Sequence, residues 1–248
     1  MDTLSKLFEE ERLDVIQEIS PNDGMYQGGN RDHYFSVGRS ALRNIKLAMA
    51  AAGKNLADIK NILDLPSGHG RVLRFLKAFF REAQITACDI ERDAVDFCAR
   101  VFDVNGLYSR KRPADIEIVD RFDLIWCGSL LTHLNFDRWP EFFYFFHSIL
   151  NSKGILVFTS HGRHCAERIR TGNFTYGLDD ASLKKLLRGF DRNGSCYVNY
   201  SNTEDYGISL SVPSHVLTLL EKFSDFQLLL YLEKGWDNHH DVVACMKI

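Results

Sequence analysis

A turn that contains two glycines follows an apolar stretch in the first third of the chain. Residues 61–71 read Asn-Ile-Leu-Asp-Leu-Pro-Ser-Gly-His-Gly-Arg, in which Asp64 stands in the apolar stretch and Gly68 and Gly70 in the turn. Where such a turn joins a strand to a helix, glycine lets a ligand approach the backbone, and free N–H groups favour an anion such as a carboxylate. A tight turn that binds nothing is the alternative for this stretch taken alone.

A second acidic residue, Asp89, stands at the end of the next apolar stretch, after Thr86-Ala87-Cys88. A carboxylate at the end of the second strand of such a sheet can accept both hydroxyls of a ribose. An N-cap for the following helix is the alternative role for this aspartate. Taken together, the glycine turn and Asp89 predict a ligand that contains adenosine.

The spacing of the glycines separates two classes of adenosine-containing ligand. A dinucleotide-binding turn requires Gly-x-Gly-x-x-Gly, whereas residues 68–73 read Gly-His-Gly-Arg-Val-Leu and lack the third glycine. An NAD-linked oxidoreductase is therefore disfavoured and is kept as an alternative.

Three stretches resemble class I S-adenosylmethionine-dependent methyltransferases. Residues 62–70, Asp89 and residues 122–134 (Phe-Asp-Leu-Ile-Trp-Cys-Gly-Ser-Leu-Leu-Thr-His-Leu) are similar to the first, second and fourth motifs of that family, over about residues 59–160 and 213–248. The chain departs from the family at Pro66, where glycine is usual, and proline removes one N–H donor.

The resemblance implies a role for each part of these motifs. Asp64 and the turn would hold the methionine portion of the cofactor, Asp89 the ribose, Ile90 and Ser109 the adenine, and residues 128–130 would line the sulfonium side. Arg39 is a candidate partner for the cofactor carboxylate, with an ordinary surface arginine as the alternative. The full set of predicted cofactor-binding residues is Arg39, Asp64, Pro66, Ser67, Gly68, His69, Gly70, Asp89, Ile90, Ser109, Gly128, Ser129 and Leu130.

Methyl transfer from a sulfonium is an in-line displacement, so the enzyme must mainly align the acceptor, the methyl group and the sulfur and exclude water. A hydroxyl acceptor also needs a base. His133 and His161 follow the fourth and fifth predicted strands and are the candidate bases, with packing as the alternative role. Further candidates for an acceptor pocket lie in predicted loops, where surface polarity is the alternative: Tyr26, His33, Tyr34, Arg163, His164, Arg168, Trp236, His239 and His240.

The elements that must position these residues alternate between strand and helix, which predicts a doubly wound, Rossmann-like α/β fold. We expect seven strands in a mostly parallel sheet with an antiparallel last strand, a helical N-terminal cap, and an inserted helix and hairpin element. The predicted strands are 59–65, 84–90, 106–109, 122–127, 154–159, 226–233 and 241–247, and the predicted helices are 4–19, 36–52, 71–81, 92–102, 138–150 and 213–223.

One methyltransferase domain is expected over residues 1–248. It divides into a cap (1–53), a cofactor-binding core (54–160), an insertion over the active site (161–212) and a segment that completes the core (213–248). The insertion is predicted to hold two short helices and a hairpin made by residues 196–200 and 208–212. Residues 21–34 and 234–240 are predicted loops.

Composition excludes several classes of protein. The formal net charge of −3 argues against a nucleic-acid-binding surface, and residues 127–130 lack the Pro-Pro-Tyr type motif of amino-methylating enzymes. The six cysteines form no Cys-x-x-Cys pair, so we expect reduced thiols and no metal. The first residues lack an export signal and no stretch is apolar enough to span a membrane, which together predict a cytoplasmic protein.

The sequence therefore predicts an S-adenosylmethionine-dependent methyltransferase that acts on a hydroxyl of a small polar or sugar-like acceptor. The segment 34–42 together with residues 64–71 is similar to bacterial members, some of which are presumed to act on glycans. Two alternatives remain, a catalytically silent S-adenosylmethionine-binding partner protein and an NAD-linked oxidoreductase. The oligomeric state is left open.

Overall fold

Seven strands form one sheet in the computed structural model, which describes residues 13–26 and 28–248. Across the sheet the order is β3 (Asn105–Tyr108), β2 (Gln84–Asp89), β1 (Asn61–Asp64), β4 (Phe122–Cys127), β5 (Leu150–Ser160), β9 (His240–Lys247) and β8 (Phe226–Trp236). The first five are parallel, and β9 runs antiparallel to both β5 and β8. This topology confirms the predicted fold class.

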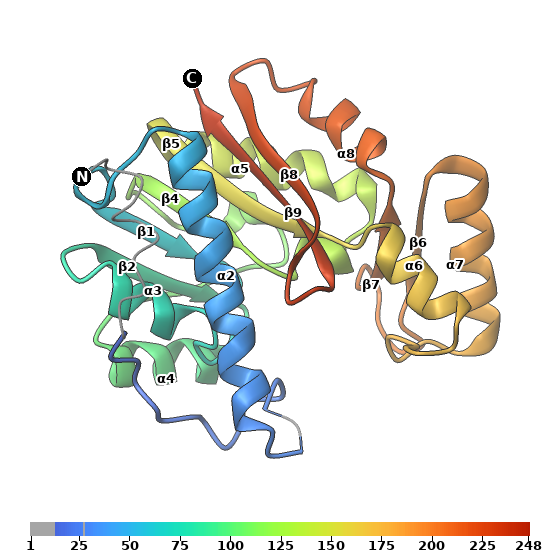
Figure 1. Ribbon diagram of the computed structural model, residues 1–248, viewed down its shortest axis with the longest axis horizontal. Coiled ribbons are helices and arrows are strands. Elements are labelled where there is room, and N and C mark those ends of the chain that lie inside the picture. Colours follow the sequence, from blue (N-terminus) through green and yellow to red (C-terminus); the bar gives the residue numbers. More distant parts are fainter. Residues whose placement is uncertain (1–12, 27) are drawn as a thin grey trace.

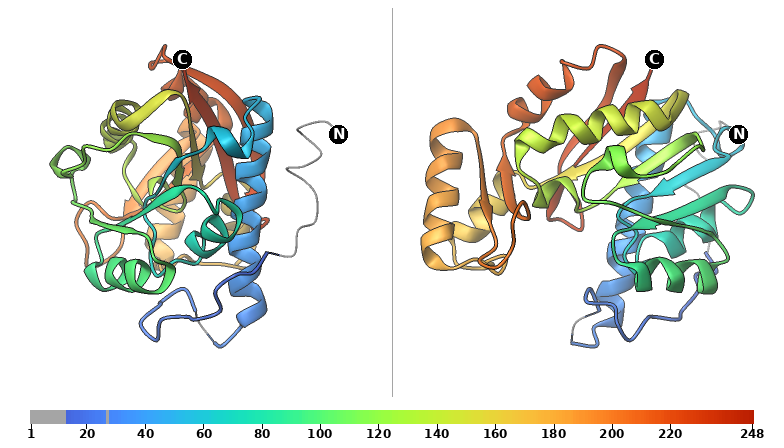
Figure 2. Two further views of the ribbon diagram at one scale, coloured as in Figure 1. Left: turned by 90° about the vertical axis from the view of Figure 1, so that its left-hand side faces the viewer. Right: turned by 180° about the vertical axis from the view of Figure 1, so that it is seen from behind.

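Successive strand residues point to opposite faces, and each face is covered by its own helices (Figures 1 and 2). Ile62 and Trp126 lie in one apolar core with α2 (Arg31–Ala51), α3 (Leu73–Phe79) and α4 (Arg92–Phe102). Their neighbours Leu63 and Cys127 lie in a second core with α5 (Trp139–Ile149) and α8 (Pro213–Leu220). Short 3-10 helices cover Leu56–Asp58, Pro113–Asp115, Leu131–His133 and Phe136–Arg138.

The inserted segment forms a lobe beside the end of β5 (Figure 1). This α6–β7 lobe contains α6 (Arg163–Arg170), α7 (Asp180–Asn193), β6 (Ser195–Asn199) and β7 (Gly207–Ser211), which pack around a third apolar core. Strands β6 and β7 pair antiparallel, so the predicted hairpin is confirmed.

The N-terminal part differs most from expectation. Residues 13–20 form no helix, so this part of the predicted helix 4–19 is wrong, and residues 4–12 lie outside the described residues. The reason is visible at Arg74, whose guanidinium binds the backbone carbonyls of Ile16 and Glu18 and so competes with helical hydrogen bonds. Helix α2 begins five residues earlier than predicted, because the Asn30 side chain caps it by accepting from the His33 N–H.

Other boundaries also differ from the predicted ranges. Strand β5 starts at Leu150, four residues earlier than the predicted strand 154–159, and it includes Lys153 at a φ of 61°. Strand β8 extends through part of the predicted loop, to Trp236, and α7, with 14 residues, is longer than the short helix predicted there. No helix in the described part of the chain is long and apolar enough to cross a membrane.

Candidate active site

A cleft of about 1410 Å³ opens at the carboxyl ends of the parallel strands. It is lined by the segments that follow β1, β2, β3 and β4, and also by the β6–β7 turn. The predicted site residues that line it are Pro66, Ser67, Gly68, His69, Asp89, Ile90, Ser109, Gly128, Ser129, Leu130, His133 and Trp236. Twelve predicted site residues do not line it: Tyr26, His33, Tyr34, Arg39, Asp64, Gly70, His161, Arg163, His164, Arg168, His239 and His240.

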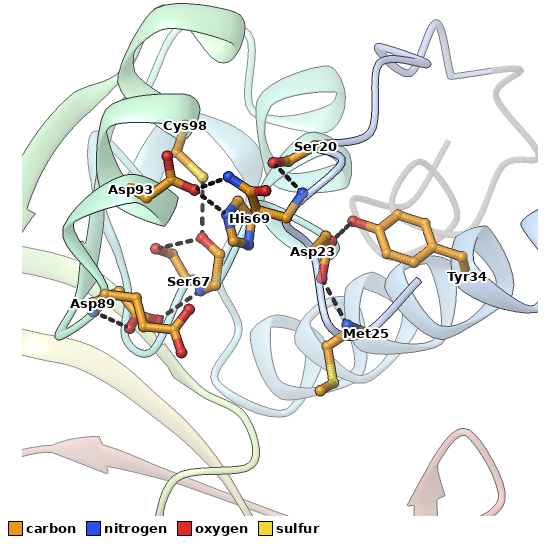
Figure 3. Close-up of polar contacts among 12 residues, drawn as sticks. Ser20, Asp23, Met25, Tyr34, Ser67, His69, Asp89, Asp93 and Cys98 are labelled. Atoms are coloured by element: carbon orange, nitrogen blue, oxygen red, sulfur yellow. Dashed lines mark hydrogen bonds and ion pairs between the residues drawn. The ribbon is translucent and has the colours of Figure 1, made fainter. Parts of the chain in front are cut away.

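Asp89 holds the glycine turn against the end of β2. Its Oδ2 accepts from the Gly68 N–H at 2.8 Å and its Oδ1 accepts from the Glu91 N–H at 2.9 Å (Figure 3). The two glycines then have different roles. Nothing lies within 4 Å of the position of a Cβ on Gly68, whereas a Cβ on Gly70 would overlap the Phe102 ring. Gly70 is therefore required by packing.

Three amides of this turn are engaged within the protein and are therefore not free for an anion. The N–H groups of Ser67, Gly68 and Gly70 donate to Cys88 O, Asp89 Oδ2 and Ser67 O, respectively, and Pro66 has no N–H. A side-chain donor at this end of the cleft would therefore add to what the turn can offer an anionic group.

Arg71 supplies such a donor, and sequence reasoning missed it. Its side chain is partly buried, its guanidinium lies 5.8 Å from the Trp236 ring centroid, and its buried Nε has no hydrogen-bond partner among the described residues. Burial lowers the pKa of Arg71, while Tyr34, Asp23 and Asp237 raise it. The signal in the sequence was its position directly after Gly70. Arg39, the candidate from sequence, is exposed and stacks on Phe75 outside the cleft.

Asp64 is a buried carboxyl group with no hydrogen bond. Both of its side-chain oxygens are buried without a partner in the part of the chain that the structure describes. Burial raises the pKa of Asp64 well above its ordinary value, and the nearby Asp89 carboxylate raises it further. At one end of the turn the Asp64 oxygens therefore lack a hydrogen-bond donor, and at the other end the Arg71 Nε–H lacks an acceptor.

The N-terminal segment is fastened beside the turn (Figure 3). His69 Nε2 lies 3.1 Å from Asp93 Oδ2, which also accepts from Asn22 Nδ2 at 3.0 Å, so the imidazole of His69 is engaged by α4. Asp23 accepts from the Tyr34 hydroxyl at 2.5 Å. Tyr34 is thus buried in a structural contact, and burial raises the pKa of its hydroxyl.

His133 lies where the sheet meets the α6–β7 lobe. Its Nδ1 is 2.9 Å from the Gly207 carbonyl oxygen, and because a carbonyl only accepts, Nδ1 carries the proton. In the neutral ring Nε2 then has the lone pair, and it lies 3.5 Å from Ser129 Oγ in the cleft lining. Tyr206 stacks on the imidazole at 5.0 Å. Burial lowers the pKa of His133, although the bond to Gly207 opposes this shift.

The second candidate base, His161, and the remaining predicted acceptor residues are held elsewhere. His161 is buried behind His133, with ring centroids 6.1 Å apart, and Arg163 pairs with Glu233 on the lobe side. His239 is fixed by Arg168 and Tyr176, and His33 lies 3.7 Å from Asp237. Tyr26 packs edge-on against Tyr34.

The β6–β7 turn contributes lining residues that sequence reasoning did not find. Residues 202–206 line the cleft, as does a basic stretch at residues 110–112. No local pattern marks this turn, because its approach to the cleft depends on how the whole lobe packs.

Comparisons with known proteins agree with this fold. Residues 62–154 match a family model described as a methyltransferase domain. A solved S-adenosylmethionine-dependent methyltransferase from Clostridium acetobutylicum aligns over 86% of this chain and 92% of its own, with 12% identity and a TM-score of 0.57. No curated protein matches the chain in sequence.

Two further solved structures have similar folds. An O-methyltransferase family protein from Burkholderia thailandensis covers 98% of this chain and 67% of its own, with 12% identity and a TM-score of 0.52. Human N-acetylserotonin methyltransferase, solved in complex with SAM, covers 98% of this chain and 65% of its own, with 13% identity and a TM-score of 0.52.

Proposed function

Because the chain has the fold of a class I S-adenosylmethionine-dependent methyltransferase and a matched methyltransferase domain, we propose that it methylates a hydroxyl group of a small polar acceptor. The proposal of a hydroxyl acceptor rests on the tautomer of His133. Its Nδ1–H donates to the Gly207 carbonyl, and its Nε2 is left as a proton acceptor beside the cleft.

The residues at the turn fit the amino-acid portion of the cofactor. Asp64 does not itself line the cleft, but its neighbour Leu65 does, and an ammonium group that reached past this lining would supply the donors that the Asp64 oxygens lack. A carboxylate would accept from the unpartnered Nε of Arg71. Both buried groups are costly to leave unpaired, so their satisfaction favours binding. We therefore assign the carboxylate to Arg71 in place of Arg39.

The nucleoside portion has its own set of contacts. Asp89 uses two oxygen lone pairs on backbone N–H groups, and a carboxylate offers about four, so it can still accept ribose hydroxyls. Ile90 is 54% exposed at the cleft and offers an apolar face to adenine, with Ser109 beside it. The remaining lining residues proposed to border the cofactor are Pro66, Ser67, Gly68, Gly128, Ser129 and Leu130.

The bound cofactor supplies an electrophilic methyl group on a sulfonium. The protein's own residues orient the acceptor and handle one proton: His133 Nε2 takes it from the acceptor hydroxyl as the oxygen attacks. Since the pKa of His133 is lowered by burial, the ring is neutral and ready to accept at pH 7. The Gly207 carbonyl then stabilises the positive charge that develops on the ring.

The acceptor is proposed to lie between His133 and the β6–β7 turn. That part of the cleft is lined by Asn202, Thr203 and Tyr206, which provide hydrogen-bonding groups and one aromatic face. Such a lining suits a sugar-like ring better than a lipid. The inserted lobe is accordingly proposed to cover the active site in a cytoplasmic enzyme.

The test is turnover on a panel of sugars, phenols, amines and thiols, measured as S-adenosylhomocysteine formed. We expect methylation of hydroxyl acceptors and a loss of kcat of about 10²–10⁴-fold in His133→Gln, with unchanged S-adenosylhomocysteine binding. His147→Gln, on α5 and outside the cleft lining, is the matched control and should keep full activity.

Other outcomes separate the alternatives. Turnover only on amines or thiols, or full activity of His133→Gln on a hydroxyl, would contradict the proposed chemistry. S-adenosylhomocysteine binding without turnover on any acceptor favours the silent binding protein, and thermal protection by NAD alone favours the oxidoreductase.

A further inference from the structure

A second cluster of chemically reactive side chains lies behind the cleft. His161 follows the end of β5, Cys165 lies on α6, and His239 lies in the turn between β8 and β9. One ligand atom from each of the three lies within 4.8 Å of the other two. His161 and Cys165 are buried, and none of the three lines the cleft. The cluster is therefore separate from the site described above.

His161 is only partly satisfied by the protein. Its Nε2 lies 3.2 Å from Nε2 of His240, and its Nδ1 is buried without a hydrogen bond to any described residue. His240 continues through Nδ1 to Thr159 Oγ1, at 3.4 Å. A buried imidazole at 2% exposure with an unpaired nitrogen is uncommon in a purely structural role.

His239 is held by two groups that a metal would have to rearrange. Arg168 Nη1 lies 2.6 Å from its Nδ1, and the Tyr176 hydroxyl lies 2.9 Å from its Nε2. Because a guanidinium only donates, it occupies one imidazole lone pair with a positive charge. Arg168 also lies 4.8 Å from the Phe174 ring centroid, so it has a second contact to keep if it leaves His239.

We propose that His161, Cys165 and His239 form a binding site for a zinc-like divalent cation. Two imidazoles and a thiolate are a ligand set that suits zinc, with the fourth position left for water. Zinc bonds of about 2.0–2.3 Å place tetrahedral ligands roughly 3.3–3.8 Å apart, so the three side chains must close by about 1 Å. Binding releases the thiol proton of Cys165 and displaces Arg168 from His239.

The spacing of the cysteines predicted no metal. These ligands come from three separate segments, so no spacing rule would reveal them. A bound cation would join the end of β5, α6 and the β8–β9 turn, and would thereby fix the α6–β7 lobe to the sheet.

The test uses the full chain without a histidine tag, stripped with a chelator and then equilibrated with Co²⁺ or Zn²⁺. We expect stoichiometric metal by elemental analysis and, with Co²⁺, a thiolate-to-cobalt charge-transfer band. Cys165→Ser should abolish the band and weaken zinc binding by more than about tenfold. Cys196→Ser, in the same lobe but outside the cluster, is the matched control and should keep both.

A variant that is expected to gain zinc affinity keeps the test informative even if Cys165→Ser misfolds. Arg168→Met removes the competing cation and should bind zinc about tenfold more tightly than the natural chain. The proposal is overturned if stripped protein takes up no stoichiometric metal, if the cobalt band survives in Cys165→Ser, or if Arg168→Met binds zinc no more tightly.

Discussion

Replacing Arg71 by methionine isolates the group that we assign to the cofactor carboxylate. Methionine preserves much of the length and apolar contact of the side chain while removing the guanidinium. Arg39→Met is the matched control, because Arg39 lies on α2, is exposed, and stacks on Phe75 in the way that Arg71 stacks on Trp236.

The expected magnitude follows from the contacts that Arg71 can offer. A hydrogen bond to a charged group contributes about 1.5–3 kcal/mol, and the lower value applies because Arg71 is only partly buried. Two such bonds to a carboxylate amount to about 3 kcal/mol, which corresponds to a roughly 150-fold rise in Kd. Arg39→Met should leave the Kd unchanged within a factor of about two.

The assay is titration calorimetry with two ligands, S-adenosylhomocysteine and 5′-methylthioadenosine. The second ligand has the nucleoside but lacks the amino-acid portion, so it cannot use Arg71. We expect Arg71→Met to weaken the first ligand strongly and the second hardly at all.

Two results would refute the assignment. Equal weakening of both ligands would mean that Arg71 shapes the cleft in general and does not meet the carboxylate. A loss in Arg39→Met that matches the loss in Arg71→Met would return the role to the residue chosen from the sequence.

Two further substitutions test the buried groups around the turn. Because the pKa of Asp64 is raised, the folded protein holds the carboxyl proton more tightly than the unfolded chain does. The stability that this protonated carboxyl contributes is therefore complete below the unfolded pKa of about 3.9, and it is lost as pH rises through the pKa of the folded state. Asp64→Asn cannot lose a proton, so its Tm should exceed that of the natural chain by an amount that grows from pH 5 to pH 8 in the absence of ligand; a shrinking difference would contradict this. Gly70→Ala should destabilise the protein by about 1–3 kcal/mol more in urea unfolding than Gly172→Ala, since both glycines have positive φ but only Gly70 packs on Phe102, and equal losses would contradict the packing role.

The parts of the fold and site that sequence predicted are those carried by local patterns. Strand β4 has the predicted bounds, because residues 122–127 are apolar except for Asp123, and a short, mostly apolar run is typical of a buried strand. Asp89 and the segment after β4 reached the cleft because the carboxyl ends of parallel strands meet at one edge.

The features of the fold and site that could not be predicted from the sequence depend on contacts between distant segments. The N-terminal residues 13–20 take their path from Arg74, which lies more than 50 positions away. Local sequence also could not show whether Arg39 or Arg71 lines the cleft. Both stand on predicted helices near the turn, and only packing decides which one enters the cleft.

In the part of the cleft proposed for the acceptor, the β6–β7 hairpin both orients the proposed base and contacts the acceptor. Gly207 orients His133 through its carbonyl, and a Cβ at this position would overlap the Val198 carbonyl oxygen, so only glycine lets β6 and β7 approach in this way. The adjacent Tyr206 stacks on the same imidazole and lines the cleft. Because the turn that contacts the acceptor also fixes the tautomer of the base, a change in its length would alter acceptor choice and catalytic rate together.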